Sequence, residues 1–406
     1  MDFAHPDPGG PAPAADDPRH FSIVLGGPLF QLLRRARLEG DALELLRRRV
    51  IVLASVAWLP LALLALFART AQGEAAPEVP FLEDIEVHVR FLLALPLLVV
   101  AELLVHLRLR PVAQEFLARG LVPADSIARF RECVRSAFRL RNSIVAELVM
   151  LALIYGFGIP FLWRQFAAFD VATWYSVPGP GGPKLTPAGI WYAYVSVPLF
   201  QFLLLRWYFR IGIWVRFLWQ VSRIRLELSA MHGDLSAGLG FLSGTVFAFV
   251  PLLMAHGALL AGAVGNRVIH LGGQLSDSYI EVGVVVAYLV LLVAAPLLAF
   301  APQIAHAKRR ASREYSRIAQ RYARDFEARW LPGGMPPSES PLGSGDIQSL
   351  ADMSNALATV RATRVFPVSR DAIVRLVLAV LLPMAPLLLT VIPAEELARR
   401  LIQLLL

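Results

Sequence analysis

The sequence is short of cysteine and of charge, and each shortage excludes a class of protein. Its only cysteine, Cys133, cannot form an internal disulfide, and we interpret it as a reduced thiol that packs in the fold. Charged residues make up 17% of the 406 residues, hydrophobic residues make up 56%, and the mean hydropathy is positive. A chain of this composition is too apolar for a soluble globular protein, and it is typical of a membrane protein.

Strand patterns, long repeats and enzyme signatures are also missing. The sequence contains no H-E-x-x-H, C-x-x-C, P-loop or G-x-S-x-G motif, and no strand precedes the "GLG" of residues 238–240 to make a dinucleotide fingerprint. We therefore expect an all-α fold and assign no catalytic, cofactor-binding or metal-binding residue. Catalysis is unsupported rather than excluded.

Seven apolar stretches are long enough, or nearly so, to cross a bilayer as helices, which takes about 20 residues each. The sequence therefore predicts a polytopic transmembrane bundle. The stretches are Val50 to Phe67, Phe91 to Leu107, Ser143 to Trp163, Ala188 to Leu205, Phe241 to Val264, Val282 to Pro302 and Leu376 to Pro393.

Composition divides the chain into four parts. The first twenty residues are rich in proline and predict a disordered tail, and residues 21–33 lack the features of a secretory signal. Aromatic and aliphatic residues at helical spacing predict two helices in the longest polar part. The expected parts are a tail (1–20), a membrane domain with six spans (21–302), a cytosolic helical hairpin (303–373), and a last span with an outer amphipathic helix (374–406).

The net charge of +8 is spread unevenly between the loops. Basic residues number seven before the first span, eight in 108–141, five in 206–225 and eleven in 308–370. They number two in 68–90, two in 164–187 and one in 265–281. This alternation follows the positive-inside rule and predicts a cytosolic N-terminus. Topology then explains the basic balance, so we do not expect nucleic acid as a partner.

Two polar segments predict amphipathic helices on the cytosolic side. Ile127, Phe130, Val134 and Phe138 share one helical face with arginines around it, which suits anionic headgroups at the membrane surface or packing on the bundle. The aromatic stripe of the hairpin's first helix indicates a packed face, and a second helix should follow from about Asp346 to Arg361. We expect the hairpin to dock against the inner ends of the spans. The members of the stripe are Tyr315, Ile318, Tyr322, Phe326 and Trp330.

Few ionisable side chains fall inside the spans, and such residues usually face partners or water because their insertion is costly. Glu102 and Glu147 should lie at similar depth in the inner leaflet, where Arg206 and Arg210 could pair with either carboxylate. One interpretation is a polar vestibule open to the cytosol that selects cations or relays protons. The other is buried pairing that fixes the helices. His256 has no obvious partner, and we expect a hydrogen-bonded histidine rather than a functional one.

The stretch HGDLSAGLGFL, residues 232–242, precedes the fifth span. Asp234 is placed to cap that helix, and Gly240 with Gly244 forms a G-x-x-x-G pair of the kind that lets helices approach closely. His232 and Asp234 could together hold a metal ion or a proton, but no third ligand lies within reach in the sequence. A helix start is the simpler interpretation.

Two stretches resemble motifs of a family of bacterial multi-pass membrane proteins of uncharacterised function. Residues 232–242 resemble H-P-D-x-x-G-G-L-G-F-L, and residues 342–355 resemble L-G-x-x-D-I-Q-S-L-A-D. Gly233 replaces a proline and Ala237 a glycine of the first pattern, which argues against a special backbone geometry there. The resemblance implies a bacterial inner-membrane location and no particular activity. The matching polar and glycine residues are His232, Asp234, Gly238, Gly240, Asp346, Gln348 and Asp352.

These observations leave three functional hypotheses. The first is a transporter or channel for a small solute or ion, based on proline-bent spans and the inner-leaflet carboxylates. The alternative is a membrane scaffold or signalling protein that binds a cytosolic protein, or a second copy of itself, through its arginine-rich helices. A weaker third is an intramembrane enzyme acting on lipid through His232 and Asp234. All three share the lipid bilayer, with its anionic headgroups, as a partner, and none requires a cofactor.

Overall fold

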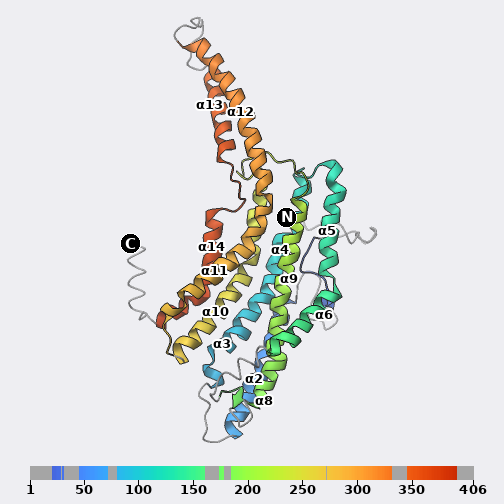
Figure 1. Ribbon diagram of the computed structural model, residues 1–406, viewed down its shortest axis with the longest axis vertical. Coiled ribbons are helices and arrows are strands. Elements are labelled where there is room, and N and C mark those ends of the chain that lie inside the picture. Colours follow the sequence, from blue (N-terminus) through green and yellow to red (C-terminus); the bar gives the residue numbers. More distant parts are fainter. Residues whose placement is uncertain are drawn as a thin grey trace.

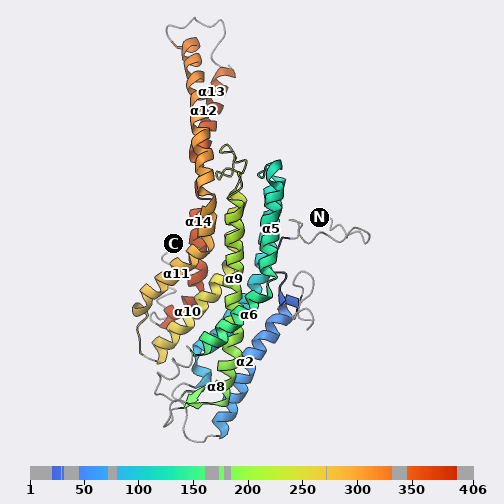
Figure 2. The same ribbon diagram turned by 45° about the vertical axis from the view of Figure 1, so that its right-hand side comes forward.

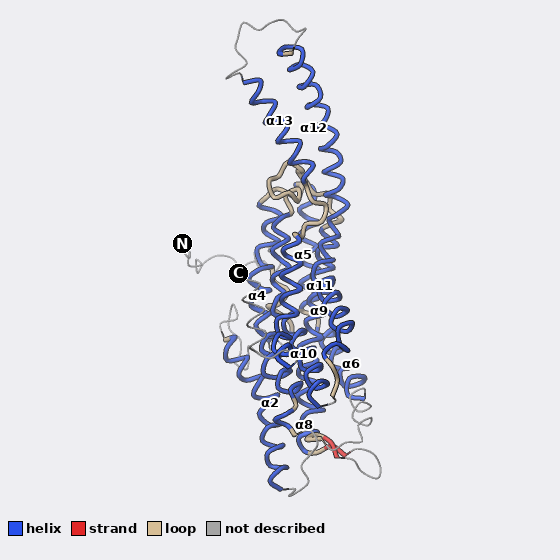
Figure 3. Tube along the Cα trace, turned by 90° about the vertical axis from the view of Figure 1, so that its left-hand side faces the viewer, coloured by secondary structure: helices blue, strands red, loops and turns tan. Residues whose placement is uncertain are grey.

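The computed structural model describes residues 21–28, 30–31, 45–71, 80–160, 173–177, 184–270, 272–331 and 345–390. These residues are almost entirely helical, and their strands form one short antiparallel pair at the end far from the α12–α13 hairpin (Figure 3). The predicted all-α class is confirmed. The helices and strands discussed below are α2 (Leu46–Ala71), α3 (Ile85–His88), α4 (Leu95–Ala118), α5 (Ile127–Arg141), α6 (Ile144–Leu153), β1 (Ser176–Val177), β2 (Lys184–Leu185), α8 (Pro187–Trp191), α9 (Val197–Val221), α10 (Val250–His270), α11 (Tyr279–Ala294), α12 (Ala301–Trp330), α13 (Gly345–Ala362) and α14 (Arg370–Leu381).

Five of the described helices are long and apolar enough to cross a membrane, and a sixth arises if two helices bent by 45° count as one broken span. The chain is therefore a multi-pass helical bundle. The predicted seventh span corresponds to α14 and the 3-10 helix Leu382–Thr390, which are not among the six, and residues 391–406 lie outside the described part. The count of seven and the orientation stay predictions. The five helices are Leu46–Ala68, Ile85–Ala118, Pro187–Val221, Gly240–His270 and Leu275–Trp330, and the bent pair is Ala124–Arg141 with Ile144–Gly158.

Prolines inside the spans are accommodated by changes of helix type. A π-helical turn ends two residues before Pro96, Pro160 and Pro198. Proline lacks an amide hydrogen and crowds the preceding turn, so a wider turn relieves the clash. The Tyr194 carbonyl, which would have accepted from residue 198 in an α-helix, accepts from the Tyr155 hydroxyl at 3.2 Å instead. Pro60 lies inside a continuous α-helix, so not every proline interrupts one.

α10 lies at the centre of the bundle. In the long helix Gly240–His270 that contains it, 67% of the most apolar stretch is buried, against 11% for Leu46–Ala68 of α2. The closest contact with α14 occurs at a glycine. A Cβ atom at Gly257 would lie 2.0 Å from the backbone oxygen of Val380 in α14. The predicted pair Gly240 and Gly244 acts differently, because Gly240 lies against the Asp234 side chain and Gly244 has nothing within 4 Å of a built Cβ. The helix contact thus depends on the glycine farther along the span.

α5 packs its apolar face on the bundle, which was one of its two expected partners. Phe130, Val134 and Phe138 are buried, and α5 lies beside α9 over much of its length (Figure 2). The chain then bends by 45° into α6. α5 therefore forms part of the bundle.

α12 is the last part of the long helix Leu275–Trp330 and pairs with α13 in an antiparallel hairpin that extends beyond the other elements (Figure 1). The expected docking of the hairpin on the ends of the spans is therefore limited to its base. Tyr315, Tyr322, Phe326 and Trp330 are half-buried in this hairpin. Ile318 is 51% exposed, so its predicted place in the stripe is wrong. Successive helical residues turn by about 100°, which puts position 318 at the edge of the α13-facing side.

Backbone and side-chain hydrogen bonds fix the base of the hairpin to the loop between α9 and α10. The amide of Arg364 donates to the Leu235 carbonyl at 2.7 Å, and the Thr363 hydroxyl donates to the Ala230 carbonyl at 2.9 Å. From α12, the Gln303 amide group donates to the carbonyls of Ser222 and Ile224. These bonds join the base of the hairpin to the bundle, and farther out α12 and α13 pack on each other.

Candidate functional site

Glu102 of α4 is the centre of a buried ion cluster that joins three helices. Its side chain is 3% exposed, and its carboxylate pairs with Arg49 of α2 and Arg210 of α9, the latter at 2.6 Å. Arg206, one helical turn before Arg210, lies 3.9 Å from the same carboxylate. Buried charges require such partners, because an unpaired ion loses its hydration without compensation.

Glu147 joins the same cluster from the first turn of α6. Its Oε1 atom lies 3.8 Å from Nε of Arg206, so this arginine lies between the two carboxylates. The structure thus brings together four of the five residues singled out within the spans: Glu102, Glu147, Arg206 and Arg210.

The N-terminal segment 21–27 covers the cluster with peptide carbonyls. Arg141, at the end of α5, donates to the Ser22 carbonyl at 2.7 Å, and Arg210 donates to the Val24 carbonyl at 3.4 Å. Arg206 donates to the Gly26 carbonyl at 3.3 Å. The chain turns away at Gly26 and Gly27, whose φ angles of 141° and 94° suit glycine.

Apolar contacts hold this segment in place. Phe21 is fully buried against the rings of Phe138, Trp214 and Phe217, with centroids 4.7–6.4 Å apart. The Ser22 hydroxyl is 3.0 Å from Nδ1 of His106 on α4. Sequence reasoning treated residues 21–33 only as a non-signal segment and missed this role. The Gly26-Gly27-Pro28 turn was the one local sign of a fixed chain reversal.

Arg49 and Arg141 are the other cluster members that the sequence did not reveal. Arg49 precedes the first apolar stretch and looked like one of several cytosolic arginines, yet its side chain is 2% exposed. Arg141 ends an arginine-rich helix whose other arginines face outward. Neither position differs locally from its neighbours, so no sequence signal separated them.

The cluster carries more positive than negative charge. Arg49, Arg206 and Arg210 lie against two carboxylates, and Arg141 is bound to the Ser22 carbonyl beside them. The cavity beside Glu147, Arg206 and Arg210 holds about 10 Å³, which is room for about one water molecule. Its geometry is that of a packed joint between helices.

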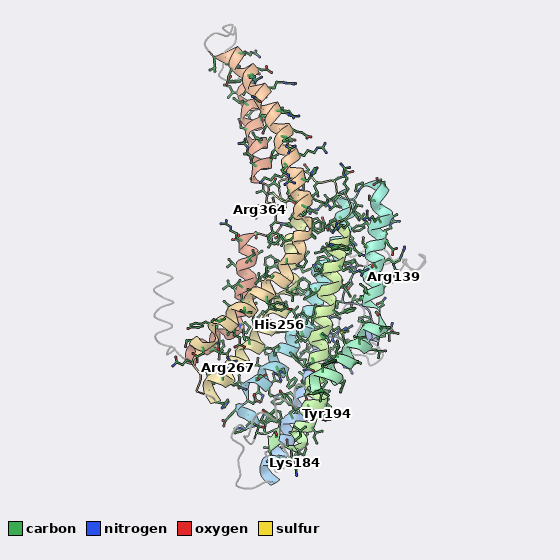
Figure 4. All side chains as sticks on the ribbon, in the orientation of Figure 1. Arg139, Lys184, Tyr194, His256, Arg267 and Arg364 are labelled. Carbon is green, nitrogen blue, oxygen red and sulfur yellow. The ribbon has the colours of Figure 1, made fainter. Side chains whose placement is uncertain are left out.

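His256 lies in α10, near the middle of the molecule (Figure 4), and its hydrogen bonds do not involve the cluster. Its Nε2 atom is 2.7 Å from the Tyr208 hydroxyl of α9, and its Nδ1 atom is 2.8 Å from the Leu252 carbonyl. Both ring nitrogens therefore have hydrogen-bond partners within the bundle.

Asp234 organises the loop before α10 rather than capping a regular α-helix. Its carboxylate accepts from the amides of Ser236 at 2.8 Å, Gly238 at 3.1 Å and Gly240 at 2.7 Å, and the helix begins as the 3-10 segment Gly240–Phe249. Burial alone would raise the pKa of Asp234, but these amides and His232 outweigh it and lower the pKa below the ordinary value of 3.8.

Gly233 and Ala237 differ from the family pattern, and on that ground we expected no special backbone geometry in residues 232–242. The structure nevertheless has one. Leu235 and Ala237 have φ angles of 54° and 58°, and Gly238 has 94°. The left-handed region disfavours residues with a Cβ atom, so Asp234 and the contact of Leu235 with Arg364 hold these residues there. The expectation from Ala237 was wrong because tertiary hydrogen bonds outweigh the local preference.

The second motif lies at the tip of the hairpin, far from the first. Asp346 at the start of α13 accepts from the Trp330 indole at 3.1 Å and pairs with Arg329 at 3.0 Å, and Gln348 donates to Asp352 at 3.0 Å. About 16 residues of α13, or roughly 24 Å, separate Asp346 from the hairpin base. The two motifs therefore do not form one site.

Within the described residues, no group of three or more histidine, cysteine, aspartate or glutamate side chains is placed to hold a metal ion. His232 and Asp234 are neighbours, and the Asp234 amide donates to Nδ1 of His232 at 3.2 Å. No family model matches the sequence, and no curated protein or solved structure is significantly similar to it.

Proposed function

We propose that this membrane protein is a scaffold whose α12–α13 hairpin binds an acidic protein in the cytosol. The carrying observation is a row of exposed arginines, Arg313, Arg317, Arg321 and Arg324, on the side of α12 away from the half-buried aromatic residues. At about 100° per residue these side chains fall within one third of the helix circumference. We call this surface the arginine row.

The hairpin suits the presentation of such a surface at a distance from the bilayer. α12 has 30 residues, which corresponds to about 45 Å at about 1.5 Å per residue. Its base is fixed by Gln303, Thr363 and Arg364, so the row has a defined direction. Arginine at an interface pairs well with carboxylates because its planar guanidinium donates in a fixed fork.

Charge supports a cytosolic position for the hairpin. Arg139 and Arg364 lie toward the hairpin end of the molecule, and Lys184 and Arg267 lie toward the other end (Figure 4). The positive-inside rule would put the end that carries more basic residues in the cytosol, which supports a cytosolic hairpin. The resemblance of residues 232–242 and 342–355 would make the membrane a bacterial inner membrane.

Transport receives less support from the geometry. The carboxylates expected to line a vestibule, Glu102 and Glu147, are surrounded by arginines and covered by the segment 21–27. A polar vestibule needs water at those carboxylates, and the space beside them is about 10 Å³.

Photo-cross-linking in cells tests the proposal. A photoreactive amino acid at Gln320, which is exposed beside the arginine row, should form a discrete adduct with one acidic protein. Charge reversal at Arg317 and Arg321 should remove that adduct because the row would then repel the partner. A photoreactive residue at exposed Leu148 of α6 is the control for nonspecific capture.

The purified adduct partner should then bind the reconstituted full chain, and binding should weaken with salt. An adduct that survives charge reversal, or one shared with the Leu148 position, would refute the proposal. Solute or ion flux through proteoliposomes that contain the wild-type chain, and not through empty liposomes, would support transport in its place.

A further inference from the structure

A basic groove lies between α5 and α9, outside the buried ion cluster. It encloses about 440 Å³, within the range of roughly 300–1,000 Å³ common for small-ligand sites. We call it the α5–α9 groove. Its lining includes Arg129, Ser136, Arg139, Arg216, Trp219 and Arg223.

Several of these arginines have positive charge available for a ligand. Glu132, which also lines the groove, pairs with Arg139 and, at 2.5 Å, with Arg135. No carboxylate in the described part of the chain pairs with Arg129, Arg216 or Arg223. Arg216 donates to the Ser136 hydroxyl at 3.3 Å, and the Arg223 guanidinium lies 5.0 Å from the centre of the Trp219 ring.

One end of the groove lies close to the exposed apolar start of α6. α5 ends at Arg141 and α6 starts at Ile144, so Arg139 lies within one or two turns of α6. Ile144, Val145 and Leu148 of α6 are each about 60% exposed or more, as suits contact with acyl chains. The exposed Trp219 has the amphipathic ring that is enriched at the membrane–water boundary.

We propose that the α5–α9 groove binds the phosphate of an anionic phospholipid headgroup. Arg129, Arg216 and Arg223 would donate charge-assisted hydrogen bonds to the phosphate oxygens, and the lipid's acyl chains would continue along α6. The site is separate from the arginine row, and it would hold the bundle at a defined depth in the inner leaflet.

Native mass spectrometry of the delipidated full chain in a neutral detergent tests this assignment. The probes are dioleoylphosphatidylglycerol, dioleoylphosphatidylcholine and soluble glycerol phosphate. The wild type should retain phosphatidylglycerol in preference to phosphatidylcholine. Arg216→Gln with Arg223→Gln should bind phosphatidylglycerol about tenfold more weakly or worse, since charge-assisted hydrogen bonds are lost.

Two further variants separate binding from folding. Arg129→Gln with Arg223→Gln leaves the Arg216–Ser136 contact intact and should show the same loss. Arg317→Gln with Arg321→Gln removes equal charge from the distant arginine row and should bind phosphatidylglycerol as the wild type does. Melting temperatures of all three should match the wild type, because every substituted side chain is exposed.

Three results would overturn the proposal. They are unchanged phosphatidylglycerol binding in both groove variants, equal retention of phosphatidylcholine by the wild type, and full displacement of the lipid by an equal concentration of glycerol phosphate. The last result would assign the groove to a soluble phosphate compound. Because the arginine row is the control surface, failure here leaves the proposed scaffold role untouched.

Discussion

Arg210 donates to Glu102 at 2.6 Å across the contact between α9 and α4, and both side chains are almost fully buried. Arg49 reaches the same carboxylate from α2. One glutamate therefore joins three helices that are distant in sequence. Removal of the carboxylate affects all of these contacts together, which makes it the most informative position to change.

Glu102→Gln should lower the free energy of unfolding by about 3–5 kcal/mol, because it leaves buried arginines without their counter-charge. Chemical denaturation in mixed micelles measures this loss. Glu115→Gln is the matched control, since its pair with Arg119 is exposed and should contribute about 0–1 kcal/mol. Equal effects of the two substitutions would show that the buried cluster does not stabilise the bundle.

Phe21→Ala should destabilise the protein by about 3–5 kcal/mol, because it removes a fully buried ring from the segment that covers the cluster. Hydrogen exchange should rise for the amides of residues 22–25 in the same variant. Phe157→Ala, at a ring that is 73% exposed, should change neither measurement appreciably. Unchanged stability and unchanged hydrogen exchange in Phe21→Ala would mean that the segment contributes little to stability.

Gly257→Ala should destabilise the contact between α10 and α14 by about 1–3 kcal/mol, since the new Cβ atom would lie 2.0 Å from the Val380 oxygen. Gly212→Ala in α9 meets nothing within 4 Å and should instead stabilise by about 0.5–1 kcal/mol through helix propensity. Thermal unfolding of both variants measures the contrast. A stability change of the same sign in both variants would contradict the close contact between Gly257 and Val380.

Asp234 should make the stability of the α9–α10 loop depend on acid pH. Its pKa is lowered in the folded protein, so its stabilising contribution is complete above the ordinary value of 3.8 and is lost as the pH falls through the folded value. The carboxylate should take up a proton within the range from roughly pH 6 to roughly pH 3. Over that range the melting temperature should fall more steeply for the wild type than for Asp234→Asn. Parallel curves for the two proteins would contradict this assignment.

Local chemistry was enough to predict the helices. Apolar runs of membrane-spanning length and the amphipathic face of residues 127–138 each depend on neighbours a few positions away. Within the described residues, the structure has helices at these positions. The aromatic stripe of α12 was predicted for the same reason, with Ile318 as the exception. The proline sites were predicted as bends, and the particular response, a π turn or a 3-10 segment, depended on neighbouring groups such as the Tyr155 hydroxyl.

The cluster was only half predictable. Glu102, Glu147, Arg206 and Arg210 stand out because charge inside an apolar run is costly wherever that run is placed. Arg49, Arg141 and the carbonyls of residues 22–26 do not stand out, because backbone carbonyls occur everywhere and these arginines lie in basic segments. Only the packing of α2, α5 and the N-terminal segment decided which of them are buried.

The sequence by itself determined that this chain forms apolar helices, with basic residues grouped in alternate loops, because hydrophobicity and helix formation depend on short stretches of chain. Tertiary structure alone decided that the carboxylates are covered by arginine and peptide groups, that Ala237 takes a left-handed conformation and that the hairpin extends from the bundle. Those outcomes depend on contacts between residues far apart in sequence. The energies of such contacts exceed the local preferences that a single sequence displays.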